Sequence, residues 1–97
     1  MEISSQSIED VVVMSPSGRI DQSTVAEFQK QLLSLVEDCA RNEHSLVLDL
    51  SGVAYMSSVG LRALMIAAKE CKKTDVRVSV AAMQSDMKEI FKSADFN

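Results

Sequence analysis

This sequence of 97 residues contains little of what usually carries catalysis or special structure. It has no tryptophan, one histidine, one proline, three glycines and two cysteines, and aromatic residues make up only 4% of the chain. With so few aromatic side chains, a core must be built mainly from aliphatic residues and methionine. The cysteines, Cys39 and Cys71, stand far apart without a C-x-x-C spacing. We therefore expect two reduced, buried thiols rather than a disulfide or a metal site.

Positive charge is also scarce, with 10 Lys and Arg against 14 Asp and Glu and a net charge of −4. Nucleic-acid binding depends on neutralising phosphates with basic side chains, so nucleic acid is not an expected partner. The N-terminal segment without a charge, Val11 to Gly18, is too short and too polar for a signal sequence or a membrane span. The remaining composition, 46% apolar and 25% charged, fits one soluble cytoplasmic domain of a bacterial type that does not bind membranes.

The spacing of apolar residues predicts strands alternating with helices. The expected strands are 2–7, 11–14, 45–50 and 76–80, and the expected helices are 25–39, 61–71 and 85–92. This order, β-β-α-β-α-β-α, predicts an α/β fold with a mixed four-stranded sheet and helices packed on it. The first two strands form an antiparallel hairpin, while strands separated by helices run parallel through right-handed crossovers.

Local signals mark the ends of these elements. Residues 15–18, Ser-Pro-Ser-Gly, close the second strand and are typical of a turn or of a group that distorts a strand edge. Thr24 and Glu27 form a T-x-x-E capping box before the first helix, and Asp21 or Ser23 can extend this cap. Lys72 and Lys73 suit the C-terminus of the second helix, because cations are favoured there.

Residues 55–62, Tyr-Met-Ser-Ser-Val-Gly-Leu-Arg, place two adjacent hydroxyl groups, Ser57 and Ser58, just before the second predicted helix. One interpretation is structural, since serine at a helix N-cap bonds free N–H groups and contributes about 1 kcal/mol. A catalytic serine is disfavoured because the G-x-S-x-G pattern is missing. The sole histidine, His44, precedes a strand whose six residues would separate it from Ser58 by about 20 Å, too far for proton transfer.

Asp49, at the end of the strand 45–50, resembles the phosphoacceptor of a receiver domain. Such a domain also needs an acidic pair after its first strand and a lysine after its last strand, and neither is found here. We expect Asp49 to bond neighbouring backbone N–H groups instead.

A further interpretation is a serine that another protein phosphorylates. The start of a helix carries partial positive charge and unpaired N–H donors, so it can accept a phosphate. Ser57 and Ser58 satisfy this argument equally, and it is compatible with capping.

The residues around these serines add a family resemblance. Asp49-Leu50-Ser51-Gly52-Val53-Ala54-Tyr55-Met56-Ser57-Ser58-Val59-Gly60-Leu61-Arg62 resembles the signature of STAS domains, the anti-sigma factor antagonists. Gly18-Arg19-Ile20-Asp21 is similar to the family's G-x-[IL]-D motif, and segments 78–83 and 87–91 resemble its last strand and following helix. The match extends over nearly the whole chain. It implies that 1–97 form a single STAS domain, shortened at the C-terminus relative to members that continue beyond Asn97.

The resemblance implies partner switching. An unphosphorylated antagonist binds a serine-protein kinase that is also an anti-sigma factor; phosphorylation by ATP releases it, and a metal-dependent serine phosphatase resets it. The position of the modified serine in the family matches Ser58, with Ser57 as a minor alternative. The chain would then be no enzyme and need no cofactor or metal. The expected partner-binding residues are Asp21, Ser23, Thr24, Ser57, Ser58, Val59, Gly60 and Arg62.

Structural roles compete with these assignments. Asp21 and Thr24 can simply cap a helix, Gly60 can permit close packing, and Arg62 can be a solvated helix residue. STAS modules also serve as constitutive assembly parts of transporters and stress-sensing complexes, where the two serines would only cap a helix.

Overall fold

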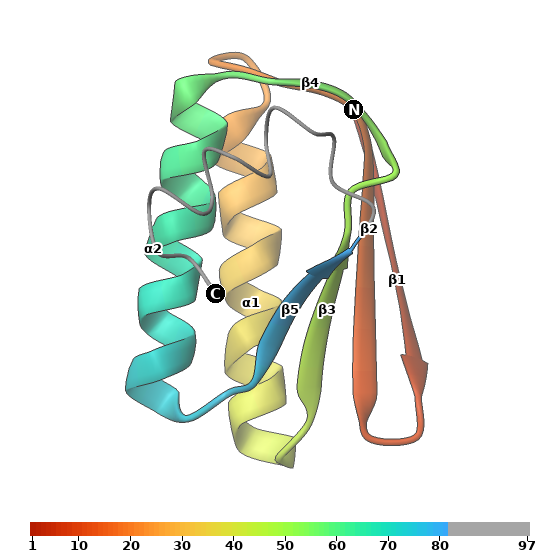
Figure 1. Ribbon diagram of the computed structural model, residues 1–97, viewed down its shortest axis with the longest axis vertical. Coiled ribbons are helices and arrows are strands. Elements are labelled where there is room, and N and C mark those ends of the chain that lie inside the picture. The colour runs from red at the N-terminus through yellow and green to blue at the C-terminus, as the bar shows by residue number, and fades with distance from the viewer. Residues whose placement is uncertain (82–97) are drawn as a thin grey trace.

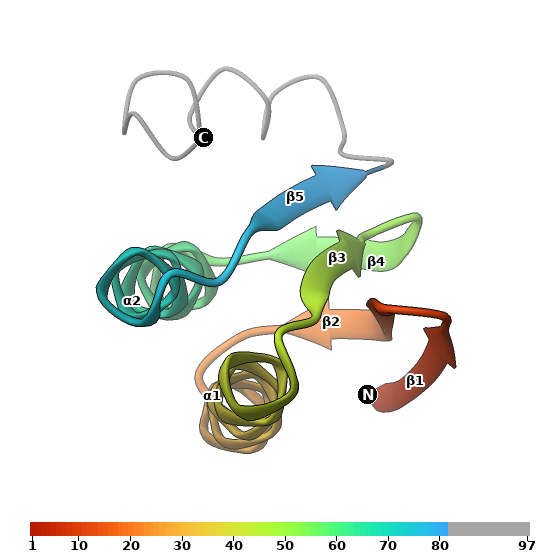
Figure 2. The same cartoon turned by 90° about the horizontal axis from the view of Figure 1, so that it is seen from below.

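The computed structural model describes residues 1–81, so the expected helix 85–92 lies outside the described residues. Its elements are β1 (Glu2–Ile8), β2 (Val11–Ile20), α1 (Val25–Asn42), β3 (Ser45–Asp49), β4 (Gly52–Met56), α2 (Ser58–Thr74) and β5 (Val78–Ala81). Both helices lie on the same side of the sheet (Figures 1 and 2). No helix within residues 1–81 is long and apolar enough to cross a membrane.

The sheet is mixed, as predicted, but it has five strands rather than four. β1 and β2 form the antiparallel hairpin, and β2, β3 and β5 run parallel in that spatial order. The strand absent from the prediction is β4, which pairs in parallel with the second half of β2. Its five residues carry no clear alternation, since residues 52, 54 and 55 are all exposed. This strand forms because β2 extends beyond the reach of β3.

β2 continues to Ile20, so the expected turn at residues 15–18 is wrong. Pro16 has no N–H to donate, which normally excludes proline from a central strand. Here it lies between the stretch that pairs with β3, ending at Met14, and the stretch that pairs with β4, starting at Ser17. At this gap no parallel neighbour in the described chain needs its N–H group, and the Pro16 ring is fully buried instead.

The core lies between the helices and one sheet face, as the helical periodicity predicted. Its helix residues are Phe28, Leu32, Val36, Cys39, Ala63, Leu64, Ala67 and Cys71. Aliphatic side chains at alternate positions of β2 and β3, such as Met14, Leu46 and Leu48, complete it. Cys39 and Cys71 are free and buried, which confirms the prediction of reduced core thiols.

The helix ends agree only partly with the sequence signals. α1 begins after Thr24 as expected, but the Thr24 side chain makes no capping bond to the helix, so the predicted capping box is wrong. The Thr24 hydroxyl instead donates to the Arg19 carbonyl at 2.9 Å and accepts from the Asp21 N–H at 3.0 Å. α2 begins at Ser58, three residues before its apolar pattern, and Lys72 and Lys73 lie in its last turn as predicted.

Candidate functional site

The ends of β2 and β4 and the starts of α1 and α2 meet at one end of the molecule (Figure 1). The Ser57 N–H donates to the Ile20 carbonyl at 2.9 Å, which fixes the start of α2 against the end of β2. An open hollow of about 430 Å³ lies at this junction. Of the residues predicted for the partner-binding surface, those that line it are Asp21, Ser23, Ser57, Ser58 and Val59. Two short segments that are far apart in the sequence, 19–23 and 55–59, therefore form one surface.

The other three predicted residues, Thr24, Gly60 and Arg62, do not line the hollow. Thr24 holds the loop before α1 through the two hydrogen bonds described above. Gly60 is buried, and a Cβ at this position would lie 2.7 Å from Met56 Cγ and 2.8 Å from Ile20 Cγ2. Its lack of a side chain therefore allows α2 to pack closely on β2 and β4. Arg62 is an exposed residue of α2.

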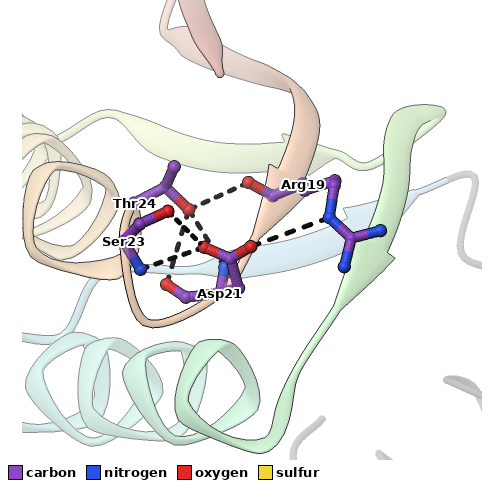
Figure 3. Close-up of polar contacts among 4 residues, drawn as sticks. All are labelled: Arg19, Asp21, Ser23 and Thr24. Atoms are coloured by element: carbon purple, nitrogen blue, oxygen red, sulfur yellow. Dashed lines mark hydrogen bonds and ion pairs between the residues drawn. The ribbon is translucent and has the colours of Figure 1, made fainter.

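The Asp21 carboxylate is the most strongly bonded polar group of the site (Figure 3). Its Oδ1 accepts from the Ser23 hydroxyl at 2.7 Å and from the Ser23 N–H at 3.0 Å, and its Oδ2 lies 3.7 Å from Arg19 Nε. The Ser23 hydroxyl, then the Ser23 N–H, and more weakly the Arg19 charge hold the pKa of Asp21 below its usual value. Asp21 is therefore a fixed negative charge at neutral pH.

Arg19, Gln22 and Tyr55 also line the hollow, although sequence reasoning did not single them out. The register between β2 and β4 shifts between Gly18 and Arg19, so that Arg19 lies opposite Tyr55. Gly18 adopts φ 97° at this irregularity, a conformation that favours glycine. The Arg19 guanidinium carbon lies 4.4 Å from the centre of the Tyr55 ring, a cation–π contact. Arg19 stands inside the Gly18–Asp21 motif, but only the strand pairing reveals its neighbour.

The two serines have different environments. Ser58 is exposed, whereas the Oγ atom of Ser57 is buried and has no hydrogen-bond partner among residues 1–81. Ser57 occupies the N-cap position with an extended backbone, as the capping interpretation requires, yet its side chain makes no capping bond to the described helix. The position of the cap was therefore predicted correctly and its hydrogen bond was not.

Two other predicted polar residues have structural surroundings. His44 precedes β3, whose first residue pairs with Val11 at the start of β2, whereas the hollow lies at the far end of β2. His44 is thus placed away from both serines. Asp49 Oδ1 accepts from the Ser51 N–H at 3.0 Å, which confirms its predicted backbone bond, and this contact lowers the pKa of Asp49. Within residues 1–81 no three His, Cys, Asp or Glu side chains cluster in a way that could hold a metal ion.

The sequence matches the model of the STAS domain family over residues 2–97. The chain belongs to this family. BtrV of Bordetella bronchiseptica, named as a candidate anti-sigma factor antagonist, is 22% identical over 96 residues, which cover 99% of this chain and 80% of BtrV. Rat pendrin is 40% identical over 53 residues, 55% of this chain but 7% of pendrin.

Solved structures show that this STAS domain has the fold of the anti-sigma factor antagonists. An antagonist from Mycobacterium paratuberculosis is 25% identical with a TM-score of 0.79, covering 97% of this chain and 77% of that chain. Unphosphorylated SpoIIAA, from Bacillus, is 13% identical with a TM-score of 0.77, covering 94% of this chain and 82% of that chain. The murine anion transporter Slc26a9 also contains this fold, with a TM-score of 0.74 and 18% identity over 91% of this chain and 14% of the transporter.

Proposed function

We propose that this STAS domain is an anti-sigma factor antagonist that works by partner switching. In its unphosphorylated form it binds an anti-sigma factor that is also a serine-protein kinase, and phosphorylation of Ser58 releases it. A serine phosphatase removes the phosphate and restores binding. The chemistry belongs to the kinase and the phosphatase, so the chain is a substrate and a ligand without catalysis or a cofactor of its own. We expect the exchange in the bacterial cytoplasm, where the kinase finds ATP.

The observation that carries this proposal is the exposed position of Ser58, the first residue of α2, which lines the hollow. A kinase must reach the oxygen it modifies, and the buried Oγ of Ser57 is far less accessible. This difference favours Ser58 over Ser57 as the acceptor. The near full-length match to BtrV supports the antagonist function, and the existence of SpoIIAA structures in unphosphorylated and phosphorylated forms supports a phosphorylation switch.

The surface around Ser58 suits a partner that recognises the unmodified state. Asp21 presents a fixed carboxylate for a basic group, and Val59 adds a partly exposed apolar side chain. A phosphate on Ser58 adds about −1.5 to −2 charges beside Asp21. That charge opposes any acidic partner group which approaches Ser58 closely, while the helix N-terminus keeps the modified domain folded. The proposed partner-binding surface also includes Ser23, which lines the hollow, and Thr24, Gly60 and Arg62, which do not.

The first test is phosphorylation by a candidate kinase with ATP. We expect Ser58→Ala to abolish labelling and Ser57→Ala to retain it, because Ser58 is exposed and the Oγ atom of Ser57 is buried. Mass spectrometry of the labelled peptide locates the phosphate. Labelling of Ser58→Ala at the wild-type level would show that the acceptor is wrong.

The second test measures binding to the same kinase without ATP. Ser58→Asp should weaken binding at least tenfold, which corresponds to about 1.4 kcal/mol. Ser34→Asp, an exposed serine of α1 outside the hollow, is the matched control and should bind as the wild type does. Equal binding by both variants would exclude a phosphorylation switch at Ser58.

The match to pendrin and the fold of Slc26a9 support a second candidate, a constitutive assembly module of a transporter or a stress-sensing complex. In this case Ser57 and Ser58 have structural roles only. Co-purification from the native host separates the two functions. The assembly module predicts the same partners for wild type, Ser58→Ala and Ser58→Asp, whereas the antagonist predicts a kinase that is lost from Ser58→Asp.

A further inference from the structure

Arg19 is a cation held loosely at the edge of the hollow. Its side chain is 64% exposed, and Nε lies 3.7 Å from Asp21 Oδ2, longer than a hydrogen bond. The guanidinium stacks on Tyr55, itself 45% exposed. Contacts of this kind between exposed groups are worth about 1 kcal/mol or less. These contacts keep Arg19 over the hollow and leave its N–H donors free to bind another group.

Arg19 is also close to Ser58 by the path of the backbone. The residue after Arg19 accepts the hydrogen bond of the Ser57 N–H, and Ser58 follows directly. The irregular pairing at Gly18 and Arg19 turns the Arg19 side chain to the same exposed face as Tyr55. Among the described residues that line the hollow, Arg19 is the one cation.

We propose that Arg19 is the phosphate-binding residue for phosphorylated Ser58, and that it exchanges Asp21 for the phosphoryl oxygens when the serine is modified. This inference rests on the proposed function, because it concerns the product of that phosphorylation. A guanidinium binds a phosphate through two parallel, charge-assisted hydrogen bonds. The Asp21 carboxylate offers a single charge at 3.7 Å, whereas the phosphoserine offers nearly two charges and three acceptor oxygens. The exchange is therefore favourable.

The exchange changes the surface in two ways. The phosphoserine lies across the hollow against Arg19 and fills space that a partner would use. Asp21 loses its neighbouring cation, which leaves a stronger negative field at the loop before α1. Phosphorylation then removes both the shape and the charge that an unmodified domain presents.

Arg62 is the competing residue, because it stands four positions after Ser58 on α2 and such pairs are neighbours on a helix surface. It does not line the hollow, and within residues 1–81 no ion pair or cation–π contact holds it in place. Arg19 is oriented before the phosphate arrives, so less side-chain entropy is lost on binding.

The test uses protein with phosphoserine incorporated at position 58 during translation, so that no kinase is needed. Phosphorus NMR against pH gives the second pKa of the phosphate, ordinarily about 6. In the wild type we expect this pKa to be lowered by roughly 0.5 to 1 unit, because an opposite charge nearby favours the dianion. Arg19→Gln should abolish most of this shift. Arg41→Gln, at the other end of α1 beside Asp38, should leave it unchanged.

The result decides between the two arginines. The proposal is overturned if Arg62→Gln removes the larger part of the shift, or if Arg19→Gln titrates like Arg41→Gln. A second measurement needs no variant: the Nε–H resonance of Arg19 should move and exchange more slowly with solvent in the phosphoserine protein than in the serine protein. An unchanged resonance would also overturn it. A kinase that does not modify Ser58 would refute the proposed function but would leave both measurements intact.

Discussion

The two ends of the helices are built differently. At their C-termini, α1 and α2 each finish on a residue in the left-handed conformation, Glu43 (φ 56°) and Asp75 (φ 62°). The residue that follows each of them donates its backbone N–H back into the last turn: His44 to the Cys39 carbonyl at 2.9 Å and Val76 to the Cys71 carbonyl at 2.8 Å. At their N-termini, Thr24 and Ser57 stand at the cap positions, but neither side chain caps the described helix.

This difference separates a structural end from a functional one. The C-terminal end satisfies its backbone within the fold, as helix ends normally do. The N-terminal end has a buried hydroxyl, Ser57 Oγ, without a hydrogen-bond partner among residues 1–81, and an ion pair at 3.7 Å; it also carries the exposed Ser58. The exposed Ser58 and the loosely paired Arg19 and Asp21 at this end are accessible to a partner or a modifying group.

The largest expected effect concerns the close packing of the N-terminal end. Gly60→Ala should lower the free energy of unfolding by roughly 1–3 kcal/mol, because the new Cβ would lie under 3 Å from Met56 and Ile20 side chains. Lys69→Ala, at an exposed site of the same helix, should change stability by about 0.5 kcal/mol or less. Urea denaturation measures both. Stabilisation by Gly60→Ala, as helix propensity alone predicts, would contradict this packing.

The C-terminal end should be sensitive to alkaline pH through Cys71. Burial, chiefly, together with the nearby Cys39 and Glu70, raises the pKa of Cys71 from 9.0 to about 11. Between these values the folded state keeps a proton that the unfolded state has lost. The thiol therefore contributes stability that is fully present below pH 9 and is lost as the pH rises to 11, roughly 2 kcal/mol in all.

The measurement for Cys71 is urea denaturation at several pH values from 8 to 11. Cys71→Ala should show a shallower decline than the wild type over this range, whatever its stability at pH 8. Parallel declines in the two proteins would show that other groups account for the loss of stability at alkaline pH.

The two cap positions should respond differently to alanine. Thr24→Ala loses the bonds to the Arg19 carbonyl and the Asp21 N–H and should cost about 1–2 kcal/mol. Ser57→Ala removes a buried hydroxyl that makes no hydrogen bond in residues 1–81, so it should be neutral or stabilise by up to about 1 kcal/mol. Replacing an ordinary N-cap serine by alanine lowers stability by about 1 kcal/mol. If thermal denaturation showed such a loss of stability for Ser57→Ala, the Ser57 side chain would cap the helix after all.

The smallest expected effect is a gain at the C-terminal end. Glu43→Gly relieves the left-handed conformation of a residue with a Cβ and should stabilise the protein by about 0.5–1 kcal/mol. Glu37→Gly, in the exposed interior of α1, is the control and should destabilise by about 1 kcal/mol. If both substitutions destabilise equally, Glu43 does not carry the backbone strain described here.

Much of the fold could be predicted because it depends on local periodicity. The apolar spacing correctly gave the positions of α1 and α2, the β1–β2 hairpin and the parallel strands β3 and β5. It failed at β4 and at the second half of β2, where Ser-Pro-Ser-Gly has the composition of a turn. The second half of β2 is a strand because it pairs with β1 up to Ser17 and with β4 from Ser17 onward, and β4 is a strand because it pairs with β2.

The same limit applies to the site. The family motifs and the loop before the first helix led to the prediction of Asp21, Ser23, Ser57, Ser58 and Val59, and these five residues line one hollow. Arg19 and Tyr55 could not be chosen in this way. They lie 36 residues apart in sequence, and their contact depends on a register shift between β2 and β4.

The sequence by itself determined the helices, the aliphatic core with two free thiols, and the stretch of chain that holds the candidate switch. These depend on side-chain periodicity and on residue types read a few positions at a time. The tertiary structure decided which hydroxyl faces solvent, why Gly60 must lack a side chain, and which cation stands beside Asp21. Those features arise where β2 pairs with β4 and α2 packs on both, and long-range contacts of this kind leave no local pattern.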